Sequence, residues 1–387
     1  MKRFPPVYNP LHRSRRIALV LLFGVIWLLG PGPHSQAALA EASCLPGVNS
    51  DCVPVGPHPL RSRLAAQGIF VPLAGLTITT PPFELTFLPY LYGQVVSANA
   101  PVYGSMEDAA RSRNPIYRMD NGFTYISYEF TDIVDDVRVY MIAPGVWMNA
   151  NDVHRISAGT FQGLTLSSNP ATPFGWILQN VESQREPGFQ GVVLTGRLYY
   201  RLNIVQAYDF RLIDETEWVA ISPGEWIEKR FVALIRPQYA PPVEAIEDRW
   251  IEVNLQEQTI AVYADRRLVF ATLISSGLDP FWTRPGLFQI REKLETTRMS
   301  GSFEADRSDY YSLEDVPWTM YFDEARALHG AYWHTGFGYA RSHGCVNLST
   351  GDARWLFDWA AVGDWVYVHD PSGNTPVDPS LYTDGGA

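Results

Sequence analysis

Residues 329–347 read HGAYWHTGFGYARSHGCVN and bring one cysteine, three histidines and several glycines into a single short segment. A thiol attacks carbon only as the thiolate, so a reactive cysteine needs a nearby imidazole to accept its proton. The attack also builds negative charge on oxygen, which main-chain amides in a glycine-rich turn can stabilise. This segment contains both kinds of group, and we expect it to form a site built around Cys345.

The cysteine count supports a special position for Cys345. The chain has three cysteines, and Cys44 and Cys52 are close enough in sequence to close a small disulfide loop in an oxidising environment. Cys345 is then the odd thiol. A buried and inert cysteine is the alternative, but a place between Gly344 and Asn347 in a polar, glycine-rich turn argues against a core position.

The first 40 residues have the pattern of a secretory signal peptide. Basic residues precede an apolar run over residues 17–29, and the small residues Ala38-Leu39-Ala40 follow as a cleavage site. The run of about thirteen residues is shorter than the roughly 20 that a membrane-spanning helix needs. We therefore predict export to the cell wall or periplasm, with an uncleaved membrane anchor as the alternative, and a linker over residues 41–85.

Charge and composition limit the class of protein. The formal net charge of -11 argues against nucleic acid as a partner. Abundant Tyr, Trp, Val and Ile, with Gly and Pro throughout, indicate short strands and turns rather than a helical fold. We expect a mostly β protein that needs no cofactor.

A weak internal repeat divides the middle of the chain. Residues 142–147 read IAPGVW and residues 221–226 read ISPGEW, and both are typical of a strand, a Pro-Gly turn and a second strand. We predict two small β units, over residues 86–160 and 161–240. The first resembles the Src-homology-like small barrels that are often attached to bacterial cell-wall enzymes. Aromatic side chains in these units either hold a peptide or glycan or pack the core, and core packing is the simpler interpretation.

Residues 247–370 are predicted to form the last domain. Apolar residues alternate with polar ones through three strands over residues 251–274, which is the pattern of a β meander. Beyond the cysteine, Ser349 is a candidate N-cap for a helix. The apolar stripe of this helix consists of Ala353, Leu356, Phe357 and Ala360. A closing strand is predicted at residues 365–368, and residues 371–387 are predicted to be a flexible tail.

The motifs of the last domain resemble a known family. His329-Gly330, Trp333 and Ser342-His343-Gly344-Cys345-Val346-Asn347 together look like the signature of the bacterial L,D-transpeptidase catalytic domain, and the resemblance covers residues 247–369. It implies a mostly β domain that cross-links peptidoglycan. Members attack the bond before the terminal D-alanine of a tetrapeptide stem, release D-alanine, and pass the thioester-bound acyl group to an amine of a neighbouring stem in a 3→3 link.

The resemblance implies roles for the reacting groups. Cys345 is the expected nucleophile, His329 its base, and the carbonyl of Gly330 the group that orients the imidazole. A zinc site is the alternative, because His329, His334, His343 and Cys345 are all good zinc ligands. Their spacing fits no common zinc pattern, so we expect no metal.

The loop around the cysteine is expected to support the reaction. The amides of His343, Gly344 and Cys345 are the expected oxyanion donors, and each such donor is typically worth on the order of 3 kcal/mol. Ser342 and Asn347 are expected to hold the loop or the substrate carboxylate. The imidazole of His343 either tunes the thiol electrostatically or hydrogen-bonds the loop, and the sequence favours neither.

The substrate is expected to contact a set of aromatic and histidine side chains. These are Trp333, His334, Tyr310 and Tyr321. Residues 300–315 are polar and aromatic, with Trp318 just beyond them, and are typical of a flap over the site. An ordinary loop that only covers the sheet is the alternative.

Three functions are compatible with these patterns. The first is an exported L,D-transpeptidase that acts on peptidoglycan stem peptides and is inhibited by β-lactams of the carbapenem class. The second is an L,D-carboxypeptidase, in which water replaces the amine acceptor. The third is a wall-binding protein whose last domain is catalytically silent.

Overall fold

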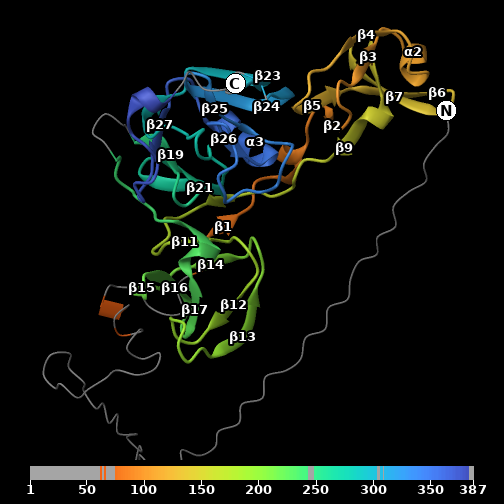
Figure 1. Ribbon diagram of the computed structural model, residues 1–387. Helices are drawn as coiled ribbons and strands as arrows, with labels where there is room; N and C mark the ends of the chain where they lie inside the picture. The colour runs from red at the N-terminus through yellow and green to blue at the C-terminus, as the bar shows by residue number, and fades with distance from the viewer. Residues whose placement is uncertain are drawn as a thin grey trace, which may run out of the picture. The chain divides into compact units, whose positions relative to one another are not determined.

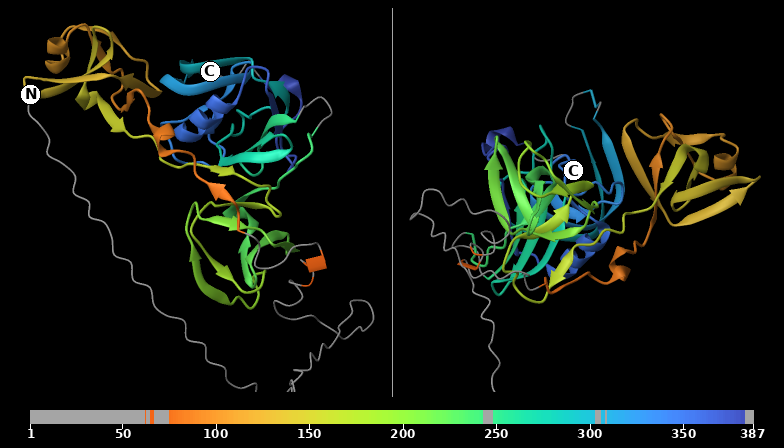
Figure 2. Two further views of the ribbon diagram at one scale, coloured as in Figure 1. Left: turned by 180° about the vertical axis from the view of Figure 1, so that it is seen from behind. Right: turned by 90° about the horizontal axis from the view of Figure 1, so that it is seen from below.

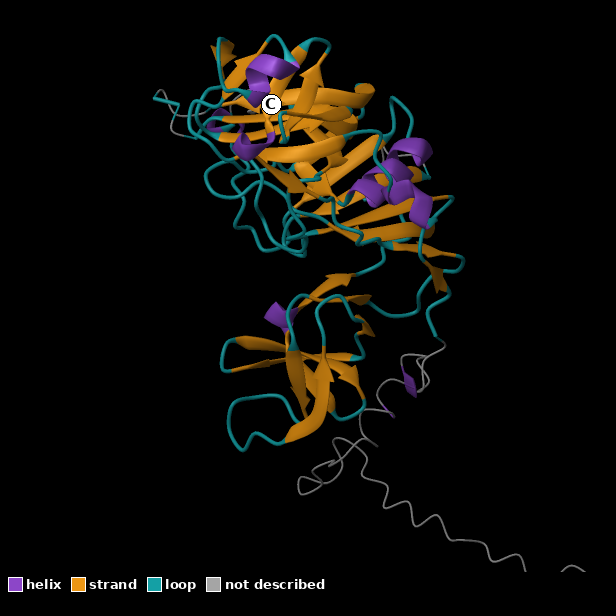
Figure 3. Ribbon diagram, turned by 90° about the vertical axis from the view of Figure 1, so that its right-hand side faces the viewer, coloured by secondary structure: helices purple, strands orange, loops and turns teal. Residues whose placement is uncertain are grey.

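The computed structural model describes residues 75–242, 248–302, 306, 307 and 309–382, together with residues 62, 65 and 66. The predicted signal peptide and the predicted disulfide between Cys44 and Cys52 lie outside these residues. In the part of the chain that is described, no helix has the length and apolar character needed to cross a membrane. Strands dominate (Figure 3), which confirms the predicted mostly β fold.

The last domain contains two sheets and one helix (Figure 1). The first sheet includes β19 (Arg249–Asn254), β20 (Thr259–Ala264), β21 (Arg267–Leu273), β22 (Gly286–Gln289) and β27 (Trp365–His369). The second includes β23 (Glu292–Gly301), β24 (Tyr311–Asp323), β25 (Arg326–Gly330) and β26 (Val346–Leu348). Strands β19, β20 and β21 form the predicted antiparallel meander. We call the antiparallel pair β23 and β24 the flap hairpin.

The helix after the cysteine begins directly after Ser349, the N-cap that was predicted from sequence. It is α3 (Thr350–Trp359), and the hydroxyl of Ser349 accepts a hydrogen bond from the amide of Asp352. The helix lies beside β24 and β25 (Figure 2), and its apolar side chains belong to a core that both sheets share. The helix ends at Ala360, before Gly363, which instead supplies a positive φ of 96° in the turn that leads to β27.

The side chain of Trp318 packs in this core and not at the open end of the flap hairpin, which corrects the expectation from sequence. Its side chain is only 6% exposed, and the guanidinium of Arg354 lies 4.0 Å from the ring centroid. The reason is the length of β24, which carries the chain from the flap into the core without a break. An aromatic residue seven positions after Tyr311 therefore lies far from the open end of the hairpin.

The two upstream regions consist of short strands and small helices. Residues 86–160 contain β2 (Leu91–Val95), β3 (Pro101–Tyr103), α2 (Met106–Ala110), β4 (Pro115–Arg118), β5 (Phe123–Tyr128), β6 (Phe130–Val134), β7 (Val137–Ala143), β8 (Val146–Asn149) and β9 (Val153–Ile156). Residues 161–240 contain β10 (Leu164–Leu166), β11 (Phe174–Ile177), β12 (Val181–Gln184), β13 (Leu194–Tyr199), β14 (Ile204–Gln206), β15 (Asp209–Ile213), β16 (Thr216–Ser222), β17 (Glu225–Glu228) and β18 (Val232–Ile235). We call these regions the first and second β units.

The two copies of the sequence repeat adopt the same succession of elements. Each has a hairpin, a short 3-10 helix and a further strand, as β7, β8 and β9 in one copy and β16, β17 and β18 in the other. The hairpin glycines, Gly145 and Gly224, both have a φ of 73°, a conformation that favours glycine. Trp147 and Trp226 are buried, so these two side chains pack the units and do not form a ligand surface.

Strands from the upstream regions also join the sheets of the last domain. Strand β10, with β1 (Ile78–Thr79) beyond it, extends the first sheet by pairing with β21. Strand β5 pairs in parallel with β24 of the flap hairpin. The last domain is therefore built from distant parts of the chain.

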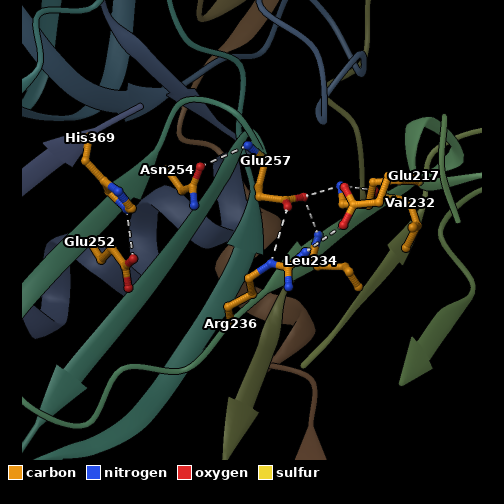
Figure 4. Close-up of polar contacts among 9 residues, drawn as sticks. Glu217, Val232, Leu234, Arg236, Glu252, Asn254, Glu257 and His369 are labelled. Carbon is orange, nitrogen blue, oxygen red and sulfur yellow. Dashed lines mark hydrogen bonds and ion pairs between the residues drawn. The ribbon is translucent and has the colours of Figure 1, made fainter. Parts of the chain in front are cut away.

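A buried carboxylate connects the second β unit to the meander (Figure 4). Glu257 lies in the turn between β19 and β20 and is 5% exposed. It accepts hydrogen bonds from Nζ of Lys229 at 2.8 Å and from the amide of Leu234 at 2.9 Å, and Arg236 lies 3.9 Å away. A buried charge is tolerated only when it is paired and hydrogen-bonded, and these contacts meet that requirement.

A second buried carboxylate, Asp352 of α3, should make stability depend on pH. Its oxygens accept hydrogen bonds from the amide of Gly163 and the hydroxyl of Thr272, but burial raises its pKa from 3.8 to about 6. Because the folded state binds the proton more tightly, this group stabilises the fold below pH 4, and the stabilisation is lost as the pH rises through about 6. The loss amounts to about 3 kcal/mol.

Asp352→Asn removes this titration. The free energy of unfolding of the variant, taken relative to that of wild type, should therefore rise by up to about 3 kcal/mol between pH 4 and pH 7. Urea unfolding at several pH values measures the difference. Asp358→Asn, on the exposed side of the same helix, is the matched control, and its free energy of unfolding should change with pH as that of wild type does. The same pH dependence in the Asp352 variant would contradict the raised pKa of Asp352.

Candidate active site

The pairing of β25 and β26 brings the two halves of the sequence motif together. The strands run in parallel, with Leu328 opposite Val346 and His329 opposite Asn347. Leu328 and Val346 are buried in the core. Because side chains alternate between the two faces of a sheet, His329 and Asn347 point to the other face, as does Cys345 two residues earlier. Cys345 comes directly before β26, and its Sγ lies 3.8 Å from the carbonyl oxygen of Ala325.

A cleft of about 650 Å³ opens over this face. The residues predicted from sequence that line it are Tyr310, His329, Trp333, His334, Ser342, His343, Cys345 and Asn347. Tyr321 does not line the cleft; it packs, partly buried, in the same apolar cluster as Cys345. Cys345 is a free thiol, and no three His, Cys, Asp or Glu side chains of the described residues converge to hold a metal ion.

Burial favours the neutral forms of the thiol and the imidazole. Desolvation raises the pKa of Cys345 from 9.0 to about 11, opposed by a main-chain hydrogen bond at Ala327 and by the charge of Arg326. Desolvation also lowers the pKa of His329 from 6.5 to about 4. These shifts favour the neutral thiol with the neutral imidazole over a thiolate with an imidazolium.

The neighbouring carbonyl sets the tautomer of His329. Nδ1 lies 3.4 Å from the carbonyl oxygen of Gly330, and a carbonyl can only accept a hydrogen bond. The ring proton is therefore on Nδ1, and the lone pair is on Nε2. This is the geometry expected of Gly330 from sequence.

The cysteine loop is held by its own side chains. The hydroxyl of Ser342 donates to the carbonyl oxygen of Cys345 and accepts from the amide of Gly344 at 3.2 Å. Thr283 donates to the carbonyl of Gly344 at 2.8 Å, and the φ of Gly344 is 119°, a value that favours glycine. In this state an oxyanion would compete with the hydroxyl of Ser342 for the amide of Gly344.

His334 and Asn347 form a neutral pair beside the thiol. The amide of Gly336 donates to Nδ1 of His334 at 3.2 Å, so the ring proton is on Nε2. Nε2 lies 3.1 Å from the carboxamide of Asn347. We assign the carboxamide oxygen to this contact, since two N–H donors cannot bond each other and that oxygen would otherwise be buried without a partner. Burial lowers the pKa of His334 to about 4, so the pair stays neutral.

The last domain matches a family model. Residues 248–368 match YkuD, the L,D-transpeptidase catalytic domain. This confirms the resemblance drawn from the histidine and cysteine motifs. The likeness of the first β unit to Src-homology-like barrels stays a prediction. No curated protein matches the chain.

Solved structures of L,D-transpeptidases are similar to part of the chain. The protein from Stackebrandtia nassauensis is 28% identical, with a TM-score of 0.27, over 35% of this chain and 60% of that one. The catalytic domain from E. faecium is 28% identical, with a TM-score of 0.29, over 32% of this chain and 99% of that one. An L,D-transpeptidase in complex with imipenem is 18% identical, with a TM-score of 0.30, over 53% and 98% of the respective chains. The chain thus spans less than two thirds of the Stackebrandtia protein.

Within the L,D-transpeptidase domain, His343 connects the cysteine loop to the flap hairpin. Its ring stacks on Tyr311 with centroids 5.3 Å apart and lies 4.6 Å from Phe281. Burial lowers its pKa, opposed by the charge of Asp309. These contacts favour a packing role over electrostatic tuning of the thiol.

Among the lining residues that were not found from sequence, two come from outside the last domain. Gly122 and Phe123 come from the first β unit, about 200 residues before the motif. They reach the L,D-transpeptidase domain because β5 pairs with β24. Long-range strand pairing leaves no local pattern in either segment, so the only available signal was the alternating apolar stretch of β5.

Proposed function

We propose that this protein is an exported L,D-transpeptidase that forms 3→3 cross-links in peptidoglycan through a thioester on Cys345. The observation that carries the proposal is the placement of a free thiol and a buried imidazole on one face of a sheet, in a domain that matches the L,D-transpeptidase model. The N-terminal signal pattern supports export, because peptidoglycan lies outside the cytoplasmic membrane.

The acylation step follows from these positions. The sulfur of Cys345 attacks the carbonyl carbon of the bond before the terminal D-alanine, and the thiol proton passes to Nε2 of His329. Main-chain amides of the cysteine loop stabilise the oxyanion. When the tetrahedral intermediate collapses, the C–N bond breaks and D-alanine leaves with the proton from the imidazolium. A thioester remains on the sulfur.

The second half of the reaction reverses these roles. The amine of a neighbouring stem attacks the thioester carbonyl, and His329 accepts the proton that the amine loses. The C–S bond breaks, the thiol regains the proton, and the new amide joins the two stems. The same electrophilic chemistry explains why we propose carbapenems as inhibitors: their strained amide carbonyl would acylate the same sulfur.

Mass spectrometry of the purified chain with a disaccharide-tetrapeptide tests the proposal. We expect an acyl-enzyme on Cys345, release of D-alanine, and cross-linked dimers as the main product. Trimmed tripeptides without dimers would instead indicate that water is the acceptor, as in an L,D-carboxypeptidase. Binding to sacculi without any adduct or turnover would indicate a catalytically silent wall-binding protein.

A further inference from the structure

The first β unit contributes part of the wall of the active-site cleft. Gly122 and Phe123 line the same cleft as Cys345 and His329, although they belong to a different β unit. A cleft whose wall comes from two parts of the chain can contact more of its substrate than a cleft formed by the catalytic domain alone.

This wall is fixed in place by main-chain pairing. The amide of Phe123 donates to the carbonyl oxygen of Tyr310 at 2.9 Å, and Phe123 is in register with Tyr311 at the start of the parallel pair of β5 and β24. A Cβ atom at Gly122 would lie 2.2 Å from the same carbonyl oxygen. Only glycine therefore permits the approach of the first β unit to the flap hairpin at this point.

Side chains next to this pairing strengthen the junction. The rings of Tyr92 and Tyr332 stack with centroids 3.7 Å apart. The hydroxyl of Tyr92 donates to the carbonyl of Asp315 at 2.9 Å, and Ser127 donates to the carboxylate of the same residue. Stacked and hydrogen-bonded aromatic groups of this kind hold a rigid interface. The position of Phe123 relative to the thiol is thus set by several independent contacts.

The side chain of Phe123 remains available to a ligand. It is 45% exposed, with its ring 4.8 Å from that of the buried Tyr125. A large apolar side chain that faces a cleft and stays open to solvent is typical of a binding surface. The apolar part of the cleft wall also includes Met299, Tyr311 and Leu313, and its charged part includes Asp309 and Arg341.

We propose that Phe123 is a substrate-contacting residue, which packs against the aliphatic part of a peptidoglycan peptide stem and helps to select it. The inference rests on the proposed function and adds to it a specificity determinant from outside the catalytic domain. A peptide stem suits the cleft because it presents aliphatic groups to the apolar wall and amides and carboxylates to the polar one. The pairing of β5 with β24 uses only main-chain atoms, so the side chain of Phe123 can change without loss of the junction.

The test compares Phe123→Ala with Phe130→Ala in the full chain. Phe130 is an equally exposed phenylalanine of the same β unit, 47% against 45%, that does not line the cleft. Phe123→Ala should lower the second-order rate of acylation by a disaccharide-tetrapeptide about tenfold, mainly through KM, which is the size expected for one aromatic contact. Phe123→Leu should recover part of the loss. Alkylation of Cys345 by iodoacetamide at pH 9 should stay within about twofold of wild type in all three variants, because a small reagent makes no use of the wall.

The possible outcomes separate this inference from the proposed function. If wild type is acylated and Phe123→Ala behaves like Phe130→Ala, the inference is wrong and the proposed function stands. If Phe123→Ala slows alkylation as much as acylation, the side chain acts on the thiol or the fold, and its role in substrate contact is overturned. If wild type forms no acyl-enzyme with the stem, the proposed function fails and this inference fails with it.

Discussion

Cys345→Ala should show no covalent adduct with either a tetrapeptide stem or a carbapenem, even after long incubation. The reason is that, among the described residues that line the cleft, Cys345 is the one thiol, and His329 lines the same cleft. The small change in volume beside the core should leave the fold intact, at a cost of about 1 kcal/mol. Intact-protein mass spectrometry reads the result directly.

The matched control for this variant removes the other two cysteines. The double variant Cys44→Ala and Cys52→Ala should form the adduct at the wild-type rate, since neither residue belongs to the cleft motif. An adduct that persists in Cys345→Ala, or disappears in the double variant, would place the nucleophile elsewhere and end the proposed mechanism.

His329→Ala should slow acylation about 10²- to 10⁴-fold, the usual contribution of a positioned general base.

The pH profile carries more information than the rate. The pKa of His329 is lowered to about 4 and that of Cys345 is raised to about 11, so the reactive combination of neutral imidazole and neutral thiol persists between these values. Wild-type acylation should therefore be nearly flat from about pH 5 to pH 10 and fall at lower pH as the imidazole becomes protonated. In His329→Ala the acid limb should vanish, and the residual rate should rise tenfold per pH unit as the thiolate forms.

His154→Ala is the control for the histidine variant, because His154 lies exposed on β9 of the first β unit. Its rate and pH profile should match wild type. A wild-type limb near pH 6 to 7 would mean that the pKa of His329 lies close to its ordinary value of 6.5, and it would contradict a desolvated imidazole. A loss of less than tenfold in His329→Ala would remove this residue from the role of base.

Several features of the last domain follow from local sequence. The β meander follows from alternation over a few residues, and α3 begins where Ser349 can cap it, because each of these signals is complete within one or two turns of chain. The candidate reacting residues were predicted for a similar reason, because a cysteine, histidines and glycines in one short segment are the groups that a thiol nucleophile needs.

Other features depend on contacts that no local segment contains. Trp318 was expected near the flap, and the length of β24 carries it into the core. Strand β10 and strand β5 lie in the upstream regions, yet they complete sheets of the last domain. Strand pairing over such separations is set by main-chain hydrogen bonds, which are the same for every residue type and so leave little trace in the sequence.

The difference between what the sequence determines and what the tertiary structure determines is clearest at the candidate active site. Residue identity alone led to the prediction that Cys345 is the nucleophile and His329 its base, because a thiolate needs a nearby imidazole to accept the thiol proton. Their protonation depends on burial, which desolvates both groups and keeps them neutral, and burial is a property of everything packed around them. The wall at Phe123 arises in the same way, since it exists only where a distant strand docks on the flap hairpin.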